Sequence, residues 1–296
     1  MEFAASFYRE EVRSGFLVTE KRKKVWAKEL EILEKFDEIC KKHGLVYYAY
    51  YGTLLGAVRH QGFIPWDDDL DVVMFRDDYE KFKVIAQQEV TEPYFYQNCY
   101  TDERIYNFSK IMDNRTTAIE FTDPPEGLHQ GIFIDIFPFD SVYDGVNEEF
   151  LMVDMLQRLL CNAIYDPFLI LDALEQGKLG RFTEFFLDFM QKDIWKKCEI
   201  FDAFCLSQFG STQKVNYISS ELNGTGSKSV YKDWMKDIIY LPFEHIQIPA
   251  PAEYDKVLTQ CYGDYHQFVQ GTSDHEGVIF DPDMPYGEYL KRYIKK

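Results

Sequence analysis

Residues 50–74 read YYGTLLGAVRHQGFIPWDDDLDVVM, and the carboxylates near the end of this stretch decide how the rest is interpreted. They fill four of the five positions 67–71 and stand directly before an apolar run. If a strand begins here, its period of two projects Asp69 and Asp71 together from the face opposite the core. Their like charges repel unless a cation lies between them. A hard divalent ion with oxygen ligands, Mg²⁺ or Mn²⁺, would relieve that repulsion.

An acidic run of this kind is often no more than a solvated turn at a strand entrance. The segment upstream of the acidic run favours a ligand-binding site instead. Residues 46–51 read as a strand, Gly52-Thr53 as a tight turn and residues 54–60 as a short helix. A helix N-terminus opened by glycine is an anion site, where the backbone can approach phosphates closely. Strand, glycine turn, helix and acidic strand follow one another in this order in the nucleotidyltransferase fold.

Another carboxylate, Asp135, lies inside the apolar segment GIFIDIFPFD at residues 131–140. Alternation along a strand places it on the face opposite the isoleucines. An ionised carboxylate in such a strand is unfavourable unless it is paired or ligated. A metal ion shared with Asp69 and Asp71 is the simplest partner, and hydrogen bonds from main-chain amides are the alternative.

Few cations are available to bind an anionic ligand in so acidic a chain. Lys110 and Arg115 stand out, on a hairpin predicted from strands at 106–112 and 115–120. Both could also be ordinary surface charges. Lesser candidates are Lys228 in the polar loop 219–229, His129, and Asp140, which is expected to cap a turn.

The run from Gly52 to Asp71 resembles the signature of the LicD family. This family includes bacterial phosphocholine transferases and is related to the fukutin-type ribitol-phosphate transferases. Ile-Asp-Ile-Phe-Pro at residues 134–138 resembles its second signature, and Tyr-Gly-Asp at 262–264 resembles its closing region. The resemblance covers residues 36–265, with a looser fit across the helical middle.

The resemblance implies an α+β protein with a nucleotidyltransferase-like mixed β-sheet core, flanking helices and an α-helical insertion. It implies catalysis by Asp69, Asp71 and Asp135 with a divalent metal. The expected reaction moves a phospho-alcohol, with phosphocholine as the leading expectation, from a CDP-alcohol donor such as CDP-choline to a hydroxyl of a cell-surface glycan or glycolipid. Residues expected to contact the donor are Gly52, Thr53, Arg59, His60, Lys110 and Arg115.

Two rival functions stay open. The same carboxylates would serve a nucleotidyltransferase that moves NMP from an NTP to a small hydroxyl acceptor. A non-catalytic nucleotide-binding module would keep the fold without the chemistry. Its mark would be a missing carboxylate, and all three are present.

The amino-acid composition limits which classes of partner and which cellular location are expected. With 50 acidic and 32 basic side chains, the formal charge of −18 disfavours nucleic-acid polymers. Six scattered cysteines without a Cys-x-x-Cys pair predict reduced core thiols rather than disulfides or a zinc site. We find neither a signal peptide nor an apolar run of about 20 residues, and therefore expect no transmembrane segment. The expected location is the cytoplasm, with action at the inner face of the membrane as an option.

Composition and pattern divide the chain into four expected parts. Residues 1–19 form an N-terminal extension. The catalytic core, 20–143, opens with an amphipathic helix over 20–43 that Gly44 ends. Residues 144–215 form a helical subdomain, and 216–296 complete the core.

Overall fold

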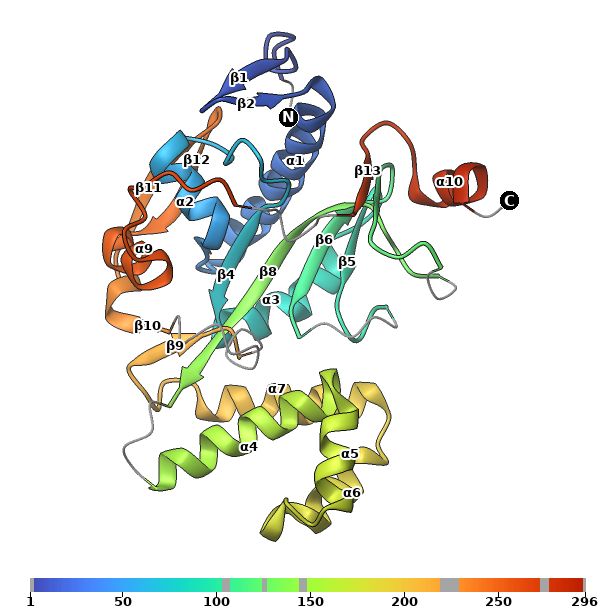
Figure 1. The fold of residues 1–296 in the computed structure, drawn as a ribbon, viewed down its shortest axis with the longest axis vertical. Coiled ribbons are helices and arrows are strands. Elements are labelled where there is room, and N and C mark those ends of the chain that lie inside the picture. The colour runs from blue at the N-terminus through green and yellow to red at the C-terminus, as the bar shows by residue number, and fades with distance from the viewer. Residues whose placement is uncertain are drawn as a thin grey trace.

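The computed structural model describes residues 3–102, 107–123, 127–143, 148–218, 229–271 and 277–294, without the side chains of residues 148–150. Within these ranges, a seven-stranded mixed sheet forms the centre of the molecule (Figure 1). Its strands are β3 (Tyr48–Ala49), β4 (Asp71–Phe75), β5 (Tyr94–Gln97), β6 (Ser109–Asp113), β8 (Ile132–Val142), β9 (Lys214–Asn216) and β10 (Val230–Tyr231). The expected α+β fold with a mixed sheet is confirmed.

Strand β8 is the longest and most central strand. It pairs in parallel with β4 on one side and antiparallel with β6 on the other. Near its end it also pairs antiparallel with β9. Every residue of β8 except Phe137 is buried. A strand covered on both faces is usually apolar throughout, so the buried Asp135 and Asp140 need particular partners.

Helices cover the sheet, and the longest of them confirms the predicted range. Helix α1 (Glu20–His43) begins where the Thr19 hydroxyl accepts the Arg22 amide at 3.2 Å. It ends at Gly44, whose φ of 66° is left-handed. Its apolar side, including Trp26, packs into the same core cluster as β8. The other helices of this part are α2 (Tyr51–His60), α3 (Arg76–Glu89), α9 (Tyr254–Tyr262) and α10 (Tyr286–Tyr289), with short turns η2 (Lys232–Met235) and η3 (Leu290–Ile294).

Two local predictions are wrong. Gly52 and Thr53 lie in the first turn of α2, not in a turn before it. The predicted hairpin also fails, because β7 (Thr117–Ile119) pairs with β13 (Ile279–Asp281) and not with β6. Both edges of β6 are already paired, with β5 and with β8. Two further pairs of strands form small sheets: β1 (Glu11–Arg13) with β2 (Phe16–Val18), and β11 (Ile238–Phe243) with β12 (Ile246–Pro251).

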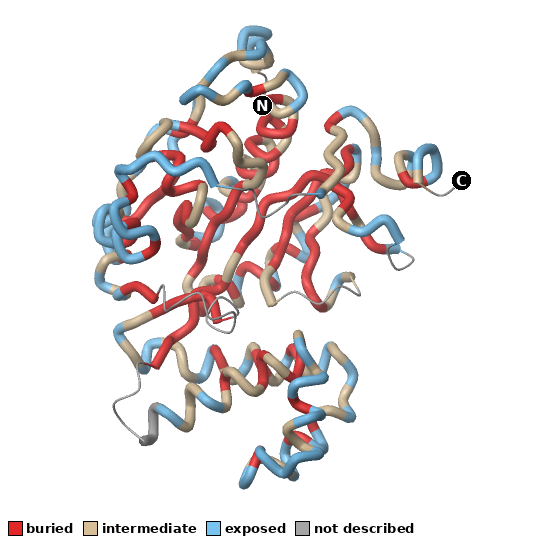
Figure 2. Tube along the Cα trace, in the orientation of Figure 1, coloured by how far each residue is buried: buried red, intermediate tan, exposed pale blue. Residues whose placement is uncertain are grey.

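Four helices and a short turn follow the end of β8 and lie together in Figure 1. They share a core cluster that includes Phe186, Phe189 and Phe201 and also takes in Val142 at the end of β8. Figure 2 shows much exposed chain on α5 and α6, in contrast to the buried central strands. The elements are α4 (Glu148–Tyr165), α5 (Pro167–Glu175), η1 (Gly180–Phe182), α6 (Thr183–Met190) and α7 (Ile194–Gln208).

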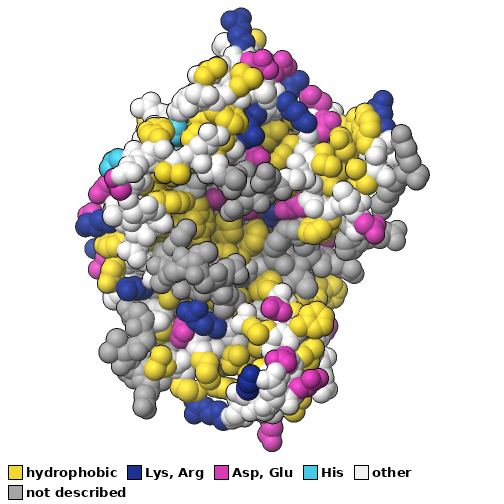
Figure 3. All heavy atoms as spheres, viewed as in Figure 1, with side chains coloured by type: hydrophobic (Ala, Val, Ile, Leu, Met, Phe, Trp, Pro, Cys, Tyr) yellow, Lys and Arg dark blue, Asp and Glu magenta, His cyan; other side chains and the backbone are white. Residues whose placement is uncertain are grey.

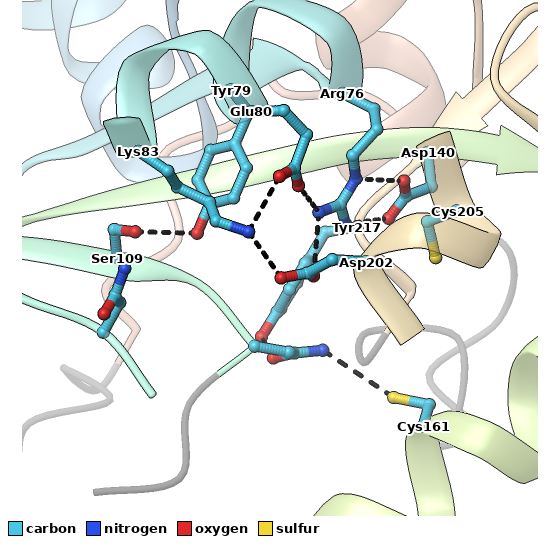
Figure 4. A network of polar contacts seen from close by, with 12 residues as sticks. Arg76, Tyr79, Glu80, Lys83, Ser109, Asp140, Cys161, Asp202, Cys205 and Tyr217 are labelled. Carbon is cyan, nitrogen blue, oxygen red and sulfur yellow. Dashed lines mark hydrogen bonds and ion pairs between the residues drawn. The ribbon is translucent and has the colours of Figure 1, made fainter. Parts of the chain in front are cut away.

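A buried ion network joins these helices to the core (Figure 4). Arg76, the first residue of α3, donates to both oxygens of Asp140 on β8 at 2.6 and 2.7 Å. It also contacts Glu80 at 2.9 Å and Asp202 on α7 at 3.2 Å. Lys83 completes the network, 2.5 Å from Asp202 and 2.8 Å from Glu80. Three elements distant in sequence are therefore linked through one guanidinium.

The cysteines agree with the prediction from their spacing. All six are buried and carry free thiols. Among the described helices, none offers an apolar stretch of the length that a bilayer-crossing segment needs.

Candidate active site

The parallel pairing of β4 and β8 places two of the predicted metal ligands side by side. Asp71 opens β4 and stands directly opposite Asp135. The Asp135 amide donates to the Leu70 carbonyl at 3.0 Å, which fixes this register. Residues directly opposite one another share a face of the sheet. Both carboxylates are nearly buried, with 8% and 5% of the residue surface exposed.

Two helices hold the loop that precedes β4. On one side, Arg22 Nη1 and Trp26 Nε1 of α1 donate to the Asp67 carbonyl at 2.6 and 3.1 Å. On the other side, the Thr53 hydroxyl of α2 accepts the Asp71 amide at 2.8 Å. These contacts position the backbone of the loop without using its carboxylates.

The loop brings further carboxylates to the strand ends. One oxygen each of Asp67, Asp68 and Asp69 lies within 4.8 Å of the other two. Burial raises the pKa of Asp69 well above its ordinary value, and the neighbouring Asp71, Asp67 and Asp135 raise it further. A divalent cation would offset this repulsion, and oxygen ligands suit Mg²⁺ or Mn²⁺. Among the described residues, Asp67, Asp68 and Asp69 therefore offer a ligand set that fits such an ion; of the three predicted ligands, Asp69 belongs to this group, and Asp71 and Asp135 lie beside it without being part of it.

Glu29 is a further acidic residue at this site that the sequence analysis missed. It lies on α1 and is 1% exposed, and its Oε2 has no hydrogen-bond partner among the described residues. Burial raises its pKa well above the ordinary value, and Asp68 and Asp67 raise it further. Glu29 follows Trp26 by three residues and Arg22 by seven. This spacing puts all three on one helical face, a signal that the alternating Lys and Glu of α1 concealed.

Of the two cations on the mispredicted hairpin, the structure brings only Lys110 to the carboxylates. Its Nζ lies 3.4 Å from both Asp135 Oδ1 and Glu120 Oε1, and the residue is 2% exposed. It also lies over the Phe133 ring, 3.4 Å from the centroid. Arg115 is half exposed and donates to Asp113 at 2.7 and 2.8 Å, and this bonding raises its pKa.

Arg59 and His60 occupy the opposite end of α2 from Gly52, about 10 Å along the helix axis. Phe268 lies over the Arg59 guanidinium at 4.0 Å and contacts the His60 ring at 5.3 Å. Burial lowers the pKa of both side chains, and Arg59 further lowers that of His60. The structure therefore keeps them apart from the N-terminal end of α2, where Gly52 and Thr53 lie. Their predicted contact with the donor stays a prediction.

The lesser candidates do not join the site. Asp140 is buried and paired with Arg76, so the prediction that it caps a turn is wrong. His129 stacks on Phe95 with ring centroids 3.5 Å apart. Lys228 lies outside the described residues.

Gly52 provides the space that the Asp67 carboxylate occupies. A Cβ at this position would lie 2.5 Å from Asp67 Oδ2. We predict that Gly52→Ala lowers the affinity for Mn²⁺ by about 10- to 100-fold in calorimetric titrations, because it displaces a carboxylate beside the metal site. The melting temperature should not fall, since alanine favours a helix over glycine by about 1 kcal/mol. Gly287→Ala is the control, because nothing lies within 4 Å of its Cβ. Unchanged Mn²⁺ affinity in Gly52→Ala would remove Asp67 from the site.

Comparison with known proteins shows which family the chain belongs to. Residues 44–163 match the LicD/FKTN/FKRP nucleotidyltransferase domain. Over 257 residues the chain is 32% identical to the lipopolysaccharide cholinephosphotransferase LicD of Haemophilus influenzae, an alignment that covers 80% of this chain and 88% of that protein. This chain belongs to the LicD family. A more distant relative is human ribitol 5-phosphate transferase FKRP, 26% identical over 101 residues, which are 34% of this chain and 18% of the human protein.

Membership of the LicD family places most of the candidate site inside the matched domain. Asp69, Asp71, Lys110 and Asp135 all lie between residues 44 and 163. Glu29 lies before the matched region, on helix α1, whose side chains donate hydrogen bonds to the backbone of the acidic loop. The LicD-family domain therefore supplies the carboxylates at the ends of β4 and β8. Helix α1, outside the matched domain, adds Glu29.

Proposed function

We propose that this LicD-family chain is a metal-dependent transferase that moves phosphocholine from CDP-choline to a hydroxyl of a cell-surface glycan precursor. The observation that carries the proposal is the pairing of Asp71 with Asp135 beside the carboxylates of Asp67, Asp68 and Asp69. The cholinephosphotransferase relative, alignable over most of both chains, supports the choice of phosphocholine.

Asp69, Asp71 and Asp135 would hold one or two Mg²⁺ ions, with Asp67 and Asp68 close enough to contribute. The bound metal would offset the charge of the donor diphosphate and of the departing CMP. Lys110 lies 3.4 Å from Asp135 in a buried position and pairs its positive charge with that carboxylate.

Helix α2 would orient the donor. Its N-terminus lies against the acidic loop, and its first amides and dipole favour a phosphate there. Gly52 allows the close approach of the Asp67 carboxylate, and Thr53 fixes the Asp71 backbone. Donor phosphates and acidic ligands would therefore meet at one helix end.

The transfer exchanges one phosphorus–oxygen bond for another. The acceptor hydroxyl oxygen bonds to the phosphorus that carries choline, and the bond from this phosphorus to the CMP phosphate oxygen breaks. CMP leaves with the bonding electrons. The hydroxyl proton passes to a carboxylate of the cluster, which acts as the general base.

Product analysis tests the proposal. The protein is incubated with Mg²⁺, a glycan acceptor and, in separate reactions, CDP-choline, CTP or ATP. The proposal predicts CMP from CDP-choline and no pyrophosphate from either triphosphate. Release of pyrophosphate would identify a nucleotidyltransferase. If every nucleotide stays intact although CDP-choline binds, the chain is a binding module and the proposal is wrong.

A further inference from the structure

A group of aromatic side chains lies beside the carboxylates of the candidate site. Its members Tyr51, Phe108, Phe137 and Tyr217 come from α2, the residue before β6, β8 and the residue after β9. Phe137 lies in the middle, with its ring centroid 5.6 Å from Tyr51, 4.7 Å from Phe108 and 4.9 Å from Tyr217. We call these four residues the aromatic patch.

The register of β8 connects the patch to the acidic site. Phe137 follows Asp135 by two residues, so both point to the same face of the sheet, about 7 Å apart along the strand. Lys110 pairs with Asp135, and continuing this antiparallel register sets Phe108 opposite Phe137. Figure 3 shows hydrophobic side chains gathered in the middle of one face of the molecule, near acidic and basic ones.

The patch keeps part of its aromatic surface accessible. Phe137 is the one residue of β8 that is not buried, whereas Phe139, the next residue on this face, is fully buried. Tyr51 and Phe108 are also only partly buried. Tyr51 has a φ of 44°, a strained conformation for a residue other than glycine. Strain of this kind persists where the surroundings fix a side chain in place, and it is common at functional sites.

A cation already contacts the patch, because Lys110 Nζ lies 5.6 Å from the centroid of the Phe108 ring. The carboxylates of Asp71 and Asp135 lie at one end of the patch, and Lys110 is balanced by both Asp135 and Glu120. A quaternary ammonium ion has no hydrogen-bond donor, so aromatic faces and nearby carboxylates are the groups that hold it. The Tyr217 hydroxyl donates to Asn107, so its hydrogen is already used and a polyol could only donate to it.

We propose that the aromatic patch binds the trimethylammonium group of choline and so selects choline over polyol donors. This assignment rests on the proposed function, which brings a phosphocholine group to the carboxylates. In the pairs that are in contact, the ring centroids lie 4.7 to 6.0 Å apart, which leaves no room for a ligand between those rings. The ammonium therefore lies on the exposed faces of the patch, while the phosphate of the same group lies toward Asp135.

Binding measurements with a matched pair of ligands test the assignment. Phosphocholine is compared with 3,3-dimethylbutyl phosphate, in which carbon replaces the ammonium nitrogen and the shape is kept. Calorimetry with Mg²⁺ should show that the wild type prefers phosphocholine by about 3- to 30-fold. Phe137→Leu and Phe108→Leu should each lose most of this preference, because leucine fills the space without an aromatic face. Phe209→Leu is the control, since this partly buried ring contacts a different cation, Lys232, at 4.1 Å.

The outcomes separate this assignment from the proposed function. Equal affinity of the wild type for the two ligands, or equal weakening of both in Phe137→Leu, would overturn the patch as an ammonium site. CMP release from CDP-choline is measured in parallel. Turnover without an ammonium preference refutes the patch alone. An ammonium preference without any turnover refutes the transferase and leaves the patch in place.

Discussion

Asp135→Asn is expected to lower the kcat for CMP release from CDP-choline by about a thousandfold. The amide keeps the shape of the side chain but removes the negative charge that stands opposite Asp71 on the neighbouring strand. It also removes one ion-pair partner of the buried Lys110, whose contact with Glu120 at 3.4 Å stays in place. The measurement is CMP release at saturating CDP-choline and Mg²⁺, with Mn²⁺ affinity by calorimetry as the second readout.

The matched control is Asp188→Asn. Asp188 is 72% exposed on α6 and pairs with Lys192 at 2.7 Å, and its replacement should leave kcat unchanged. A kcat for Asp135→Asn within tenfold of the wild-type value, with normal Mn²⁺ affinity, would show that Asp135 does not act in the site.

Arg76→Met is expected to lower the free energy of unfolding by about 3–5 kcal/mol. Arg76 and Asp140 are both almost fully buried, and the substitution leaves Asp140 without its bidentate partner. The change also removes the contact between α3 and Asp202 on α7. Urea unfolding followed by tryptophan fluorescence measures the loss.

A second variant identifies the cause of this loss. Adding Asp140→Leu to Arg76→Met should recover most of the stability, because no uncompensated charge then remains at the pair. Lys81→Met serves as the surface control, since Lys81 is 59% exposed and pairs with nearby Asp78 at 2.8 Å. Its effect should stay below about 0.5 kcal/mol. A loss for Arg76→Met as small as that of the control would contradict the role assigned to the network.

Local sequence patterns predicted the elements that local physics determines. Helix α1 was predictable because a capping threonine and a left-handed glycine bound one apolar face between residues 20 and 43. Strand β8 was predictable from alternation and from its apolar content. Asp135 was singled out because a charge lies inside such a strand. The structure places it in register with Asp71, and its catalytic role stays a prediction.

Long-range pairing is what the sequence did not reveal. A strand pattern does not name its neighbour, and β7 pairs with β13, which is more than 150 residues away. Asp140 looked like a turn residue because its partner Arg76 lies 64 positions earlier. Glu29 looked like one of many surface charges, but in the folded protein it is buried, and the charges of Asp68 and Asp67 act on it. Each miss concerns a residue whose environment is built by distant segments.

The most direct measurement of the central claim is the position of Mn²⁺ in crystals grown with CDP-choline. We predict an anomalous difference peak among the carboxylates of Asp69, Asp71 and Asp135, in contact with the donor diphosphate and with Asp67 or Asp68 nearby. A bound donor whose metal lies elsewhere, or whose diphosphate lies away from the ends of β4 and β8, would contradict the account.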